Sequence, residues 1–299
     1  MKMSTQLRQL LARPEMVIAP GAYDGLTARV IEQAGFPAVY MTGAGASAAR
    51  GFPDFGLLTM SEMVESAGVM ARSISVPLIA DADTGYGNEL NVTRTVREYE
   101  SRNVAAIHIE DQVMPKRCGN LDGKEIVSRE EFISKIRAAV AARRDPDFII
   151  IARTDARAVV DLQEAVARAN AALAAGADLA FVEAPQTLDE IMAIPRLVNG
   201  PCMLNLVPGG RTPLLDLAQA EAMGYRMTIL PGVLLTPIIE TCDGILQNLM
   251  ASRLLAAPKP GENVGDFFRR LGSDEWNLLR TSFQGEIAAT LATRIASKE

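Results

Sequence analysis

Residues 77–110 read PLIADADTGYGNELNVTRTVREYESRNVAAIHIE. The stretch begins and ends with short apolar runs, at 77–81 and 105–110. Residues 89–102 between them are amphipathic and long enough for about three helical turns. A buried strand followed by a helix and a second buried strand predicts parallel pairing of the two strands, because the helix carries the chain back to the edge where the first strand began.

The same alternation runs through most of the chain. Apolar runs rich in β-branched residues predict eight strands, at residues 16–19, 38–42, 77–81, 105–110, 148–153, 179–183, 202–205 and 227–230. Amphipathic segments predict helices at residues 22–34, 61–73, 89–102, 129–144, 162–175 and 213–223. Eight such units predict a TIM-type (β/α)8 barrel of the α/β class. The length of 299 residues, 48% of them hydrophobic, fits one large core of this kind as well as two average domains.

An open, doubly wound sheet is the competing architecture. Its dinucleotide-binding members carry a Gly-x-Gly-x-x-Gly turn after the first strand, and this sequence has none there. We therefore favour the barrel and assign residues 1–234 to its core. Residues 235–299 are expected to add C-terminal helices, at 235–257 and 267–297, with a break at 258–261.

Composition argues against several classes of protein. The net charge is −6, from 30 basic and 36 acidic residues, and no basic stripe is present, so a nucleic-acid partner is not expected. The N-terminus lacks the apolar core of a signal peptide, and the longest apolar run, near 227–239, is too short to span a membrane. We expect a soluble, cytoplasmic protein with no membrane partner. The cysteines are odd in number and widely spaced, which predicts free thiols at Cys118, Cys202 and Cys242.

Polar side chains end nearly every predicted strand. The C-terminal ends of barrel strands form the active-site mouth, so these are candidate site residues: Thr42, Asp81, Asp83, Glu110, Arg153, Glu183 and Asn205. For any one of them alone, a rim residue or a helix cap is the alternative. Carboxylates converging on one mouth repel one another unless a cation or a shared proton lies among them. Oxygen ligands and a single histidine favour Mg²⁺, or Mn²⁺, over zinc. That histidine, His108, is expected to be hydrogen-bonded in the core.

Residues 111–128 form a connection far longer than the roughly two to six residues usual in such folds. We expect this long loop to act as a lid that carries Cys118. The neighbouring Lys116 and Arg117 would favour the thiolate, and Gly119 gives the backbone freedom to move. A cysteine in this setting suits proton transfer or nucleophilic attack, and an incidental surface thiol is the alternative.

Several motifs together resemble the isocitrate lyase/phosphoenolpyruvate mutase superfamily. They are Tyr40-Met41-Thr42-Gly43, Asp54 in Gly51-Phe52-Pro53-Asp54, Asp81-Ala82-Asp83-Thr84-Gly85-Tyr86-Gly87, His108-Ile109-Glu110-Asp111-Gln112, Lys116-Arg117-Cys118-Gly119 and Ile151-Ala152-Arg153-Thr154-Asp155-Ala156. The match covers about residues 20–232. It implies a barrel whose eighth helix is exchanged between subunits, usually in a homotetramer. It also implies that the substrates are small α-oxy or α-keto carboxylates held on Mg²⁺.

The resemblance further implies roles for individual residues. Asp81 would ligate the metal, and Asp54, Asp83 and Glu110 would support it, largely through water. The substrate would be bound by Tyr40, Thr42, Gly43, Ala44, Gly119, Asn120, Arg153, Asn205 and Val233. The expected catalytic residues are Lys116, Cys118, Arg153 and Glu183.

The segment around Cys118 looks like the carbon–carbon lyase branch of the superfamily, because the phosphonate mutases carry asparagine at that position. Asn120 stands where this branch normally has histidine, and asparagine carries neither a proton nor a charge at neutral pH. Val233 stands where serine or threonine is common, which favours an alkyl substituent near the reacting carbon.

These features predict a Mg²⁺-dependent lyase that cleaves a 2-hydroxy di- or tricarboxylate, such as 2-methylisocitrate or 2,3-dimethylmalate, to pyruvate or glyoxylate and a carboxylate. Lys116 would stabilise the enediolate fragment, and Cys118 would protonate it. Hydrolysis or decarboxylation of oxaloacetate on the same scaffold and phosphonopyruvate chemistry are alternatives. A non-catalytic ligand-binding relative and a Schiff-base aldolase are weaker ones, the latter because no lysine ends a predicted strand.

Overall fold

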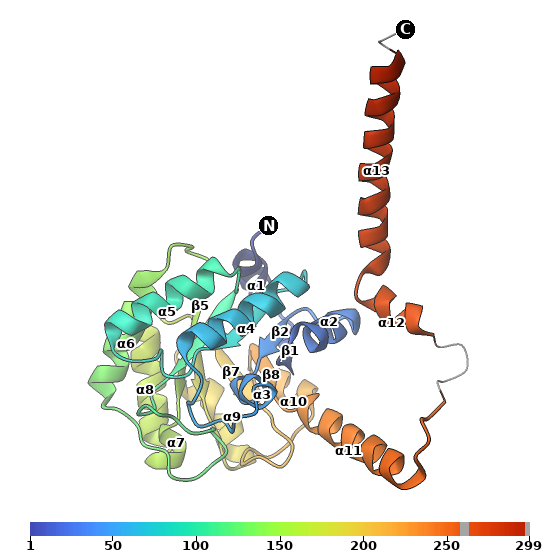
Figure 1. The fold of residues 1–299 in the computed structure, drawn as a ribbon. Helices are drawn as coiled ribbons and strands as arrows, with labels where there is room; N and C mark the ends of the chain where they lie inside the picture. The colour runs from blue at the N-terminus through green and yellow to red at the C-terminus, as the bar shows by residue number, and fades with distance from the viewer. Residues whose placement is uncertain (258–262, 297–299) are drawn as a thin grey trace. The chain divides into compact units, whose positions relative to one another are not determined.

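Eight parallel strands follow one another in chain order around a closed barrel (Figure 1). The computed structural model describes residues 1–257 and 263–296. Its strands are β1 (Val17–Ala22), β2 (Val39–Met41), β3 (Leu78–Asp81), β4 (Ala106–Glu110), β5 (Ile149–Thr154), β6 (Leu179–Val182), β7 (Cys202–Asn205) and β8 (Met227–Leu230). Strand β8 pairs with β1 and closes the barrel. The predicted TIM-type barrel is confirmed, and each predicted strand overlaps an observed one.

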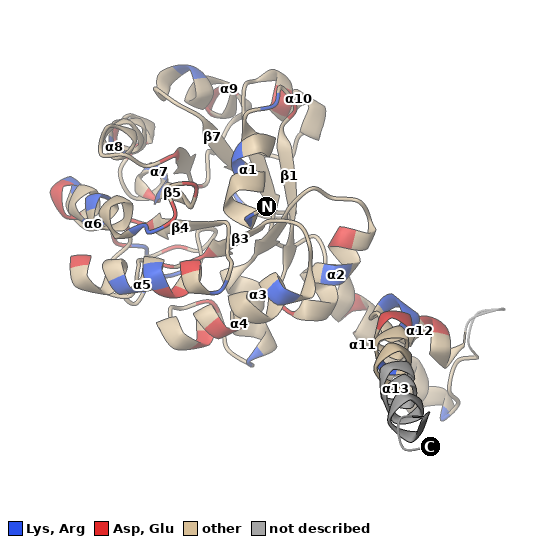
Figure 2. Ribbon diagram, turned by 90° about the horizontal axis from the view of Figure 1, so that it is seen from above, with Lys and Arg blue, Asp and Glu red and all other residues tan. Residues whose placement is uncertain are grey.

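Helices connect the strands and form an outer ring. They are α2 (Gly25–Gln33), α3 (Gly43–Ala49), α4 (Met60–Ser73), α5 (Glu89–Ser101), α6 (Arg129–Ala142), α7 (Ala156–Val159), α8 (Leu162–Ala174), α9 (Leu188–Leu197) and α10 (Leu217–Ala222). Side chains fix where several of them begin: Asp24, Thr59 and Asn88 each close a capping box. Lys and Arg segments are interspersed with Asp and Glu segments along α4, α5 and α6 (Figure 2). The ring therefore shows no stripe of one charge on these helices.

Four helices are missing from the predicted set: α1 (Met3–Leu11), α3, α7 and α9. Helices α3 and α7 are too short for their apolar periodicity to be recognised. Helix α1 precedes the first strand. Its Leu7 is buried with the barrel interior, and Arg8 donates hydrogen bonds to the carbonyl of Asp147 and, at 2.9 Å, to the Asp178 carboxylate. Helix α1 thus covers the barrel end opposite the strand C-termini.

Strand parity decides which side chains reach the mouth of the barrel. Ile79, Ile151 and Met203 belong to the apolar cluster that fills the interior, whereas the neighbouring Leu78 and Ala80 pack toward the helices. Residues two positions beyond the interior residues share their direction. The polar residues Asp81, Arg153 and Asn205 stand at these positions, so they project into the C-terminal mouth above the apolar filling.

The chain divides into two compact units, Met1–Cys242 and Asp243–Glu299. Helix α11 (Leu235–Ser252) spans the division, and α12 (Val264–Arg270) and α13 (Ser273–Ala296) belong to the second unit. The break predicted at 258–261, like Ser297, lies outside the described residues. The single helix predicted over 267–297 is wrong, because the backbone leaves the helical conformation at Gly272 (φ 91°) and separates α12 from α13. The assignment of 1–234 to the core stays a prediction.

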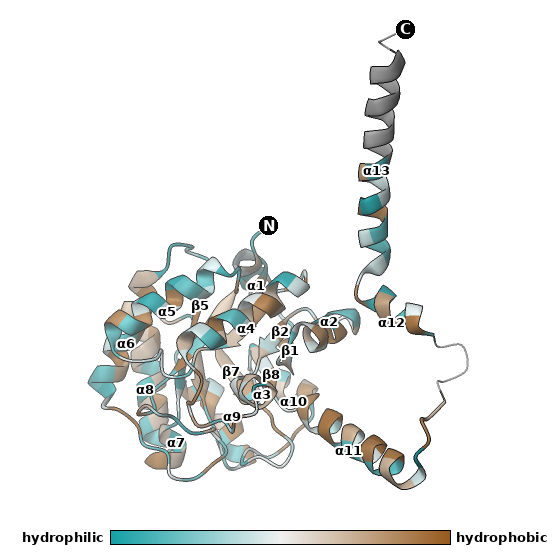
Figure 3. Cartoon of the chain, in the orientation of Figure 1, coloured by the Kyte–Doolittle hydropathy of each residue, from teal (hydrophilic) through white to brown (hydrophobic). Residues whose placement is uncertain are grey.

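Helix α11 is predominantly hydrophobic (Figure 3). It has no buried residue, and its Ile239, Ile245, Leu246 and Met250 are more than half exposed. Among the described residues, no helix is both long and apolar enough to cross a membrane. An apolar helix without a covered face is typical of an element that packs against another chain.

Candidate active site

A cavity opens at the C-terminal ends of the strands. Its wall contains most of the predicted site residues: Tyr40, Thr42, Ala44, Asp54, Asp81, Cys118, Gly119, Asn120, Arg153, Glu183 and Asn205. They come from four strands, from helix α3 and from loops far apart in the sequence. The predicted metal ligand Asp81 and the predicted proton donor Cys118 therefore face the same space.

Two of the predicted substrate-binding residues do not line this cavity. Gly43 lies against Asp81, and a Cβ at position 43 would collide with the carboxylate oxygen Oδ2. A side chain there would displace Asp81, so Gly43 makes room for it. Val233 is 40% exposed and contributes nothing to the wall. The apolar part of the wall comes instead from Val207, Pro231 and Leu235.

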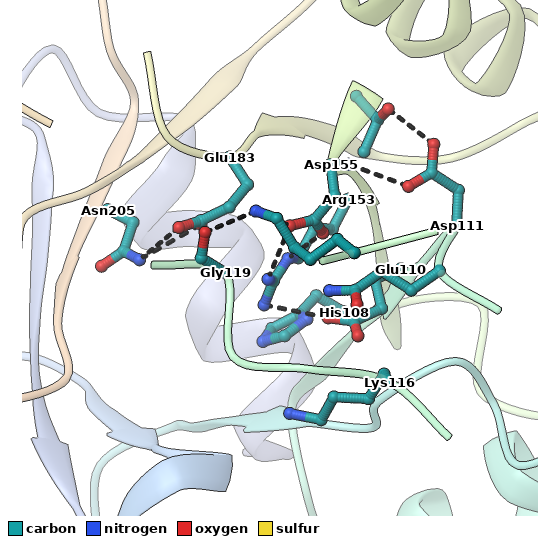
Figure 4. A network of polar contacts seen from close by, with 12 residues as sticks. His108, Glu110, Asp111, Lys116, Gly119, Arg153, Asp155, Glu183 and Asn205 are labelled. Atoms are coloured by element: carbon teal, nitrogen blue, oxygen red, sulfur yellow. Dashed lines mark hydrogen bonds and ion pairs between the residues drawn. The ribbon is translucent and has the colours of Figure 1, made fainter. Parts of the chain in front are cut away.

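Arg153, near the end of β5, is the central cation of the site (Figure 4). Its Nη1 lies 3.0 Å from Glu110 Oε2, and its Nε lies 3.0 Å from Asp155 Oδ2. The guanidinium also stacks over Phe181, with its carbon 5.3 Å from the ring centroid. Burial alone would lower the pKa of Arg153, but Asp155 and Glu110 raise it well above its ordinary value. Arg153 is thus a fixed, permanently charged group suited to bind a carboxylate.

Lys116 lies among the acidic side chains next to the cavity. Its Nζ is 2.5 Å from Asp54 Oδ1 and 2.9 Å from Asp83 Oδ1, and its side chain is only 2% exposed. Burial would raise the pKa of Asp81, but the protonated forms of His108, Lys116 and Arg153 outweigh it and lower the pKa to about 2. For Asp83, burial prevails over the attraction of Lys116 and raises the pKa to about 6.

The assignment of Asp54, Asp81, Asp83 and Glu110 to one metal site stays a prediction. Within the described residues, no three His, Cys, Asp or Glu side chains are grouped so that they could hold a metal ion. The cations Lys116 and Arg153 occupy this region and pair with Asp54, Asp83 and Glu110. The donor chemistry nevertheless fits a hydrated Mg²⁺, because Glu110 Oε1 is buried without a hydrogen bond. Asp81 faces the cavity together with Asp54 and Glu183.

His108 occupies the barrel interior below the site, as predicted. Its Nε2 is 2.8 Å from the Tyr40 hydroxyl and 3.6 Å from Asp81 Oδ1, and the residue is fully buried. Burial lowers the pKa of His108 to about 4. The imidazole is therefore neutral at physiological pH, and it fixes the Tyr40 hydroxyl at the cavity wall.

The long loop (residues 111–128) is held at its stem and docked at its tip. Its two ends pair as a short antiparallel ladder, with hydrogen bonds from Val113 N to Glu125 O (2.8 Å) and from Val127 N to Asp111 O (2.9 Å). At the tip, Cys118 N donates to the carbonyl of Asp54 at 3.1 Å. This contact holds the thiol at the cavity wall.

The expectation that nearby cations favour the Cys118 thiolate is wrong. Burial and the neighbouring Asp54 raise the pKa of Cys118, and the charges of Lys116 and Arg153 do not compensate. Lys116 is neutralised by its own acidic partners, and the guanidinium of Arg117 turns away to lie 5.6 Å from the ring centroid of Phe55. Cys118 is thus a protonated thiol at neutral pH, which suits a proton donor better than a nucleophile.

Asn120 lines the cavity and also joins the long loop to the segment that follows β7. Its Oδ1 accepts a hydrogen bond from Arg211 N at 3.0 Å, while Arg211 Nε donates to its backbone carbonyl at 3.2 Å. The Arg211 guanidinium pairs with Asp122. The side-chain oxygen of Asn120 is therefore already hydrogen-bonded within the protein. The side-chain NH2 group can donate a hydrogen bond to a ligand.

Sequence reasoning missed several residues of the site. The cavity wall also contains Val207, Leu235 and Thr236. These residues follow strand ends at irregular distances, so neither strand parity nor residue type identifies them as part of the wall. Asp155 appears in a motif without an assigned role, and Lys124 carried no signal, because one lysine in a polar loop looks like a solvated charge.

Known proteins share much of this sequence. The family model described as phosphoenolpyruvate phosphomutase matches residues 7–250. The 2,3-dimethylmalate lyase of Eubacterium barkeri is 53% identical over 232 residues, which are 77% of this chain and 80% of that protein. The 2-methylisocitrate lyase of Aeropyrum pernix is 42% identical over 244 residues, 82% of this chain and 79% of that protein.

Solved structures are similar over nearly the full length. Oxaloacetate acetylhydrolase in complex with 3,3-difluorooxalacetate has a TM-score of 0.91 and 37% identity, and the alignment covers 94% of this chain and 97% of that one. Phosphonopyruvate hydrolase in complex with oxalate and Mg²⁺ has a TM-score of 0.85 and 32% identity, with 94% and 99% covered. Together with the family model, these relatives confirm what the motifs indicate: the chain belongs to the phosphoenolpyruvate mutase/isocitrate lyase superfamily.

Proposed function

We propose that this protein is a Mg²⁺-dependent carbon–carbon lyase that cleaves an alkyl-substituted 2-hydroxydicarboxylate, of the 2,3-dimethylmalate type, to pyruvate and a second carboxylate. The observation that carries the proposal is the single cavity onto which Cys118, Arg153 and Asp81 open. These groups are a proton donor, a carboxylate-binding cation and a hard metal ligand. Similarity to enzymes named 2,3-dimethylmalate lyase and 2-methylisocitrate lyase supports the reaction type.

Asp81 is the direct metal ligand in this proposal, with Asp54, Asp83 and Glu110 binding the water around the ion. Support comes from Glu110 Oε1, which is buried without a hydrogen bond, and from the Mg²⁺ in the phosphonopyruvate hydrolase complex. A bound Mg²⁺ would polarise the C2 oxygen of the substrate and offset its negative charge. Mn²⁺, with similar ligand preferences, would be an effective substitute.

The remaining steps belong to side chains of the chain itself. Arg153 would hold the carboxylate next to the 2-hydroxyl group. Glu183, whose pKa is raised by burial, would receive the hydroxyl proton as the bond between C2 and C3 breaks. Cys118 would then give its thiol proton to the carbon of the departing fragment, and Lys116 would balance the negative charge that accumulates beside Asp54 and Asp83.

The apolar wall of Val207, Pro231 and Leu235 supports a substrate that carries methyl groups. Replacing Val207 with threonine keeps the shape of the side chain but exchanges a methyl group for a hydroxyl. We expect kcat/KM for 2,3-dimethylmalate to fall about 10-fold or more relative to that for unsubstituted malate, since a hydrophobic contact of this size contributes about 1–3 kcal/mol to discrimination. Competition between the two substrates, read by mass spectrometry, measures the ratio. An equal loss for both substrates would argue against an alkyl pocket at Val207.

Gly119 packs directly on the charged residues of the site (Figure 4). A Cβ at position 119 would lie 2.6 Å from Glu183 Oε1 and 2.7 Å from Arg153 Nη2. Gly119→Ala should therefore push the long loop away from the site and lower kcat/KM about 10²-fold, because a displacement of about 1 Å in a reacting group has an effect of this size. Gly68→Ala, where the nearest atom is the flexible Arg102 side chain at 3.3 Å, is the matched control and should retain full activity. Parent-like kinetics of Gly119→Ala would show that the loop docks differently during turnover.

A substrate panel tests the proposed function directly. The protein is incubated with Mg²⁺ and a series of 2-hydroxy and 2-oxo di- and tricarboxylates, with EDTA-treated samples as controls, and products are identified by mass spectrometry. We expect pyruvate and propionate from 2,3-dimethylmalate, and loss of both products with EDTA. No cleavage of any hydroxy acid, combined with binding of oxalate or pyruvate, would favour a non-catalytic relative.

The second candidate is hydrolysis of oxaloacetate, which the similarity to oxaloacetate acetylhydrolase supports. The products separate the reactions: oxalate and acetate indicate hydrolysis, whereas pyruvate and carbon dioxide indicate decarboxylation. The apolar wall favours the lyase, because oxaloacetate carries no methyl group to fill it. Phosphonopyruvate cleavage is a third candidate, which is detected as released phosphate when phosphonopyruvate is added to the panel.

We also propose the homotetramer with exchanged helices that the superfamily resemblance implies. The support in this chain is the apolar, uncovered α11, with Ile239, Ile245 and Leu246 each more than half exposed. Light scattering coupled to size-exclusion chromatography measures the molar mass in solution. A monomer at micromolar concentration would contradict the proposed exchange.

A further inference from the structure

Lys124 is a buried cation in the second half of the long loop, and it lies outside the cavity wall. Its side chain is 2% exposed, although the neighbouring Asp122, Gly123 and Glu125 are exposed. The ammonium donates to the backbone carbonyl of Gly119 and lies 2.9 Å from Asp155 Oδ1. One lysine therefore joins the loop tip, which carries Cys118, to the segment that follows β5.

Asp155 connects this lysine to the substrate-binding cation. Its Oδ1 accepts hydrogen bonds from Lys124 and, at 3.3 Å, from Arg153 Nη2, while its Oδ2 accepts from Arg153 Nε at 3.0 Å. The carboxylate is fully buried, and its backbone N–H donates to Asp111 Oδ1 at 2.8 Å. Burial would raise the pKa of Asp155, but Arg153 and Lys124 lower it to about 2. Both cations thus share one permanently ionised carboxylate.

The loop tip and Arg153 also meet directly, because Gly119 leaves no space for a side chain between itself, Glu183 and Arg153. The position of Gly119 consequently constrains Arg153 from one side, and Asp155 constrains it from the other. Lys124 contacts both Gly119 and Asp155. Losing its ammonium would leave a buried carbonyl and a buried carboxylate each short of a donor, at a place where water has little access.

We infer that Lys124 is a positioning residue that couples the docked position of the Cys118 segment to the orientation of Arg153, through the carboxylate that it shares with Arg153. This inference rests on the proposed function for its consequence in turnover, but the coupling itself is a property of the protein without substrate. With Lys124 in place, the proton donor and the carboxylate-binding cation are set together. Without it, each is free to move independently of the other.

The reactivity of the Cys118 thiol reports on this coupling without any substrate. All proteins carry Cys242→Ser, which removes an exposed thiol, while Cys202 is buried. The rate of Cys118 alkylation by iodoacetamide is followed by peptide mass spectrometry. We expect Lys124→Met to raise the rate about 10-fold or more, and Lys124→Arg, which keeps the charge, to stay closer to the parent. Lys135→Met is the matched control, since Lys135 is also buried but forms its ion pair with Glu131 on its own helix, and it should alkylate like the parent.

A double-mutant cycle with Asp155→Asn separates coupling from simple loosening of the loop. Asp155 is hydrogen-bonded to Lys124, Arg153 and Asp111. Its neutralisation should nevertheless also raise the alkylation rate, and the double variant should be no faster than the faster single variant. Rates that multiply in the double variant, or an alkylation rate of Lys124→Met within twofold of the parent, would overturn the inference. Lys124→Arg and Asp155→Asn provide the test if Lys124→Met does not fold.

The last part of the experiment measures kcat and KM of the same variants with the substrate that the panel identifies. Lys124→Met is expected to lower kcat and raise KM together, because it releases both Cys118 and Arg153, whereas a purely structural lysine would change stability without this combined change. If no hydroxy acid is cleaved by the parent protein, the proposed function fails while the alkylation result still decides the coupling.

Discussion

Replacing Cys118 with serine is expected to lower kcat by about 10²–10⁴-fold, the usual contribution of a positioned general acid. A serine hydroxyl is a far weaker acid than a thiol, so it cannot deliver a proton to carbon at a useful rate. The raised pKa of Cys118 keeps the thiol protonated in the resting enzyme, which is the form the proposed step requires. Steady-state kinetics with 2,3-dimethylmalate measure the effect.

Two measurements make this result specific. Titration calorimetry with Mg²⁺ should give the same affinity for Cys118→Ser and parent protein, because the thiol lies outside the proposed ligand set. Cys242→Ser, which alters an exposed cysteine, should turn over at the parent rate. Unchanged turnover in Cys118→Ser would remove this residue from the mechanism and leave the loop with a purely shielding role.

Replacing Arg153 with methionine is expected to cost about 3–5 kcal/mol of unfolding free energy, in addition to abolishing turnover. The side chain pairs with Glu110 and Asp155, which are both fully buried. Its positive charge also lowers the pKa of Glu183 against the effect of burial. Methionine has similar bulk but no charge, so it leaves buried carboxylates without their principal cation. Urea denaturation of the metal-free protein at one protein concentration gives the free energy of unfolding.

Arg94→Met is the matched control for this loss. Arg94 pairs with Glu98 at 3.7 Å on the surface of α5, with side chains 66% and 40% exposed. Exposed pairs of this kind contribute less than about 0.5 kcal/mol, so the control should unfold like the parent protein. If Arg153→Met were equally stable, the buried acids would have to be protonated in the folded state, and the charge balance described for the site would be wrong.

Much of this fold could be predicted from local pattern. Buried parallel strands are continuous apolar runs, and the end of such a run is visible in the sequence as its first polar residue. Asp81, Arg153 and Asn205 were located in this way, and the structure places all three on one cavity. These polar residues of the cavity wall were thus accessible to sequence reasoning because strand parity and strand ends are one-dimensional properties.

Other features depend on contacts between distant segments, which no local pattern contains. Lys116 looked like a loop cation able to activate Cys118, but it folds back between two acids and its charge is neutralised there. Val233 looked like the source of an alkyl pocket, but its side chain misses the cavity and Val207, from the preceding strand unit, supplies that surface. In both cases the residue type was informative, and the direction of the side chain was decided by tertiary packing.

The cavity wall is divided along the chain. Residues between Tyr40 and Glu183 supply its charged groups and its thiol, whereas Val207 and the segment around Pro231 and Leu235 supply most of its apolar surface. Changes in the later segment can alter which molecules are accepted while the bond-breaking apparatus stays intact. Substitutions in this short stretch of sequence could therefore change the substrate preference, in evolution or by design, while the polar residues of the cavity wall stay the same.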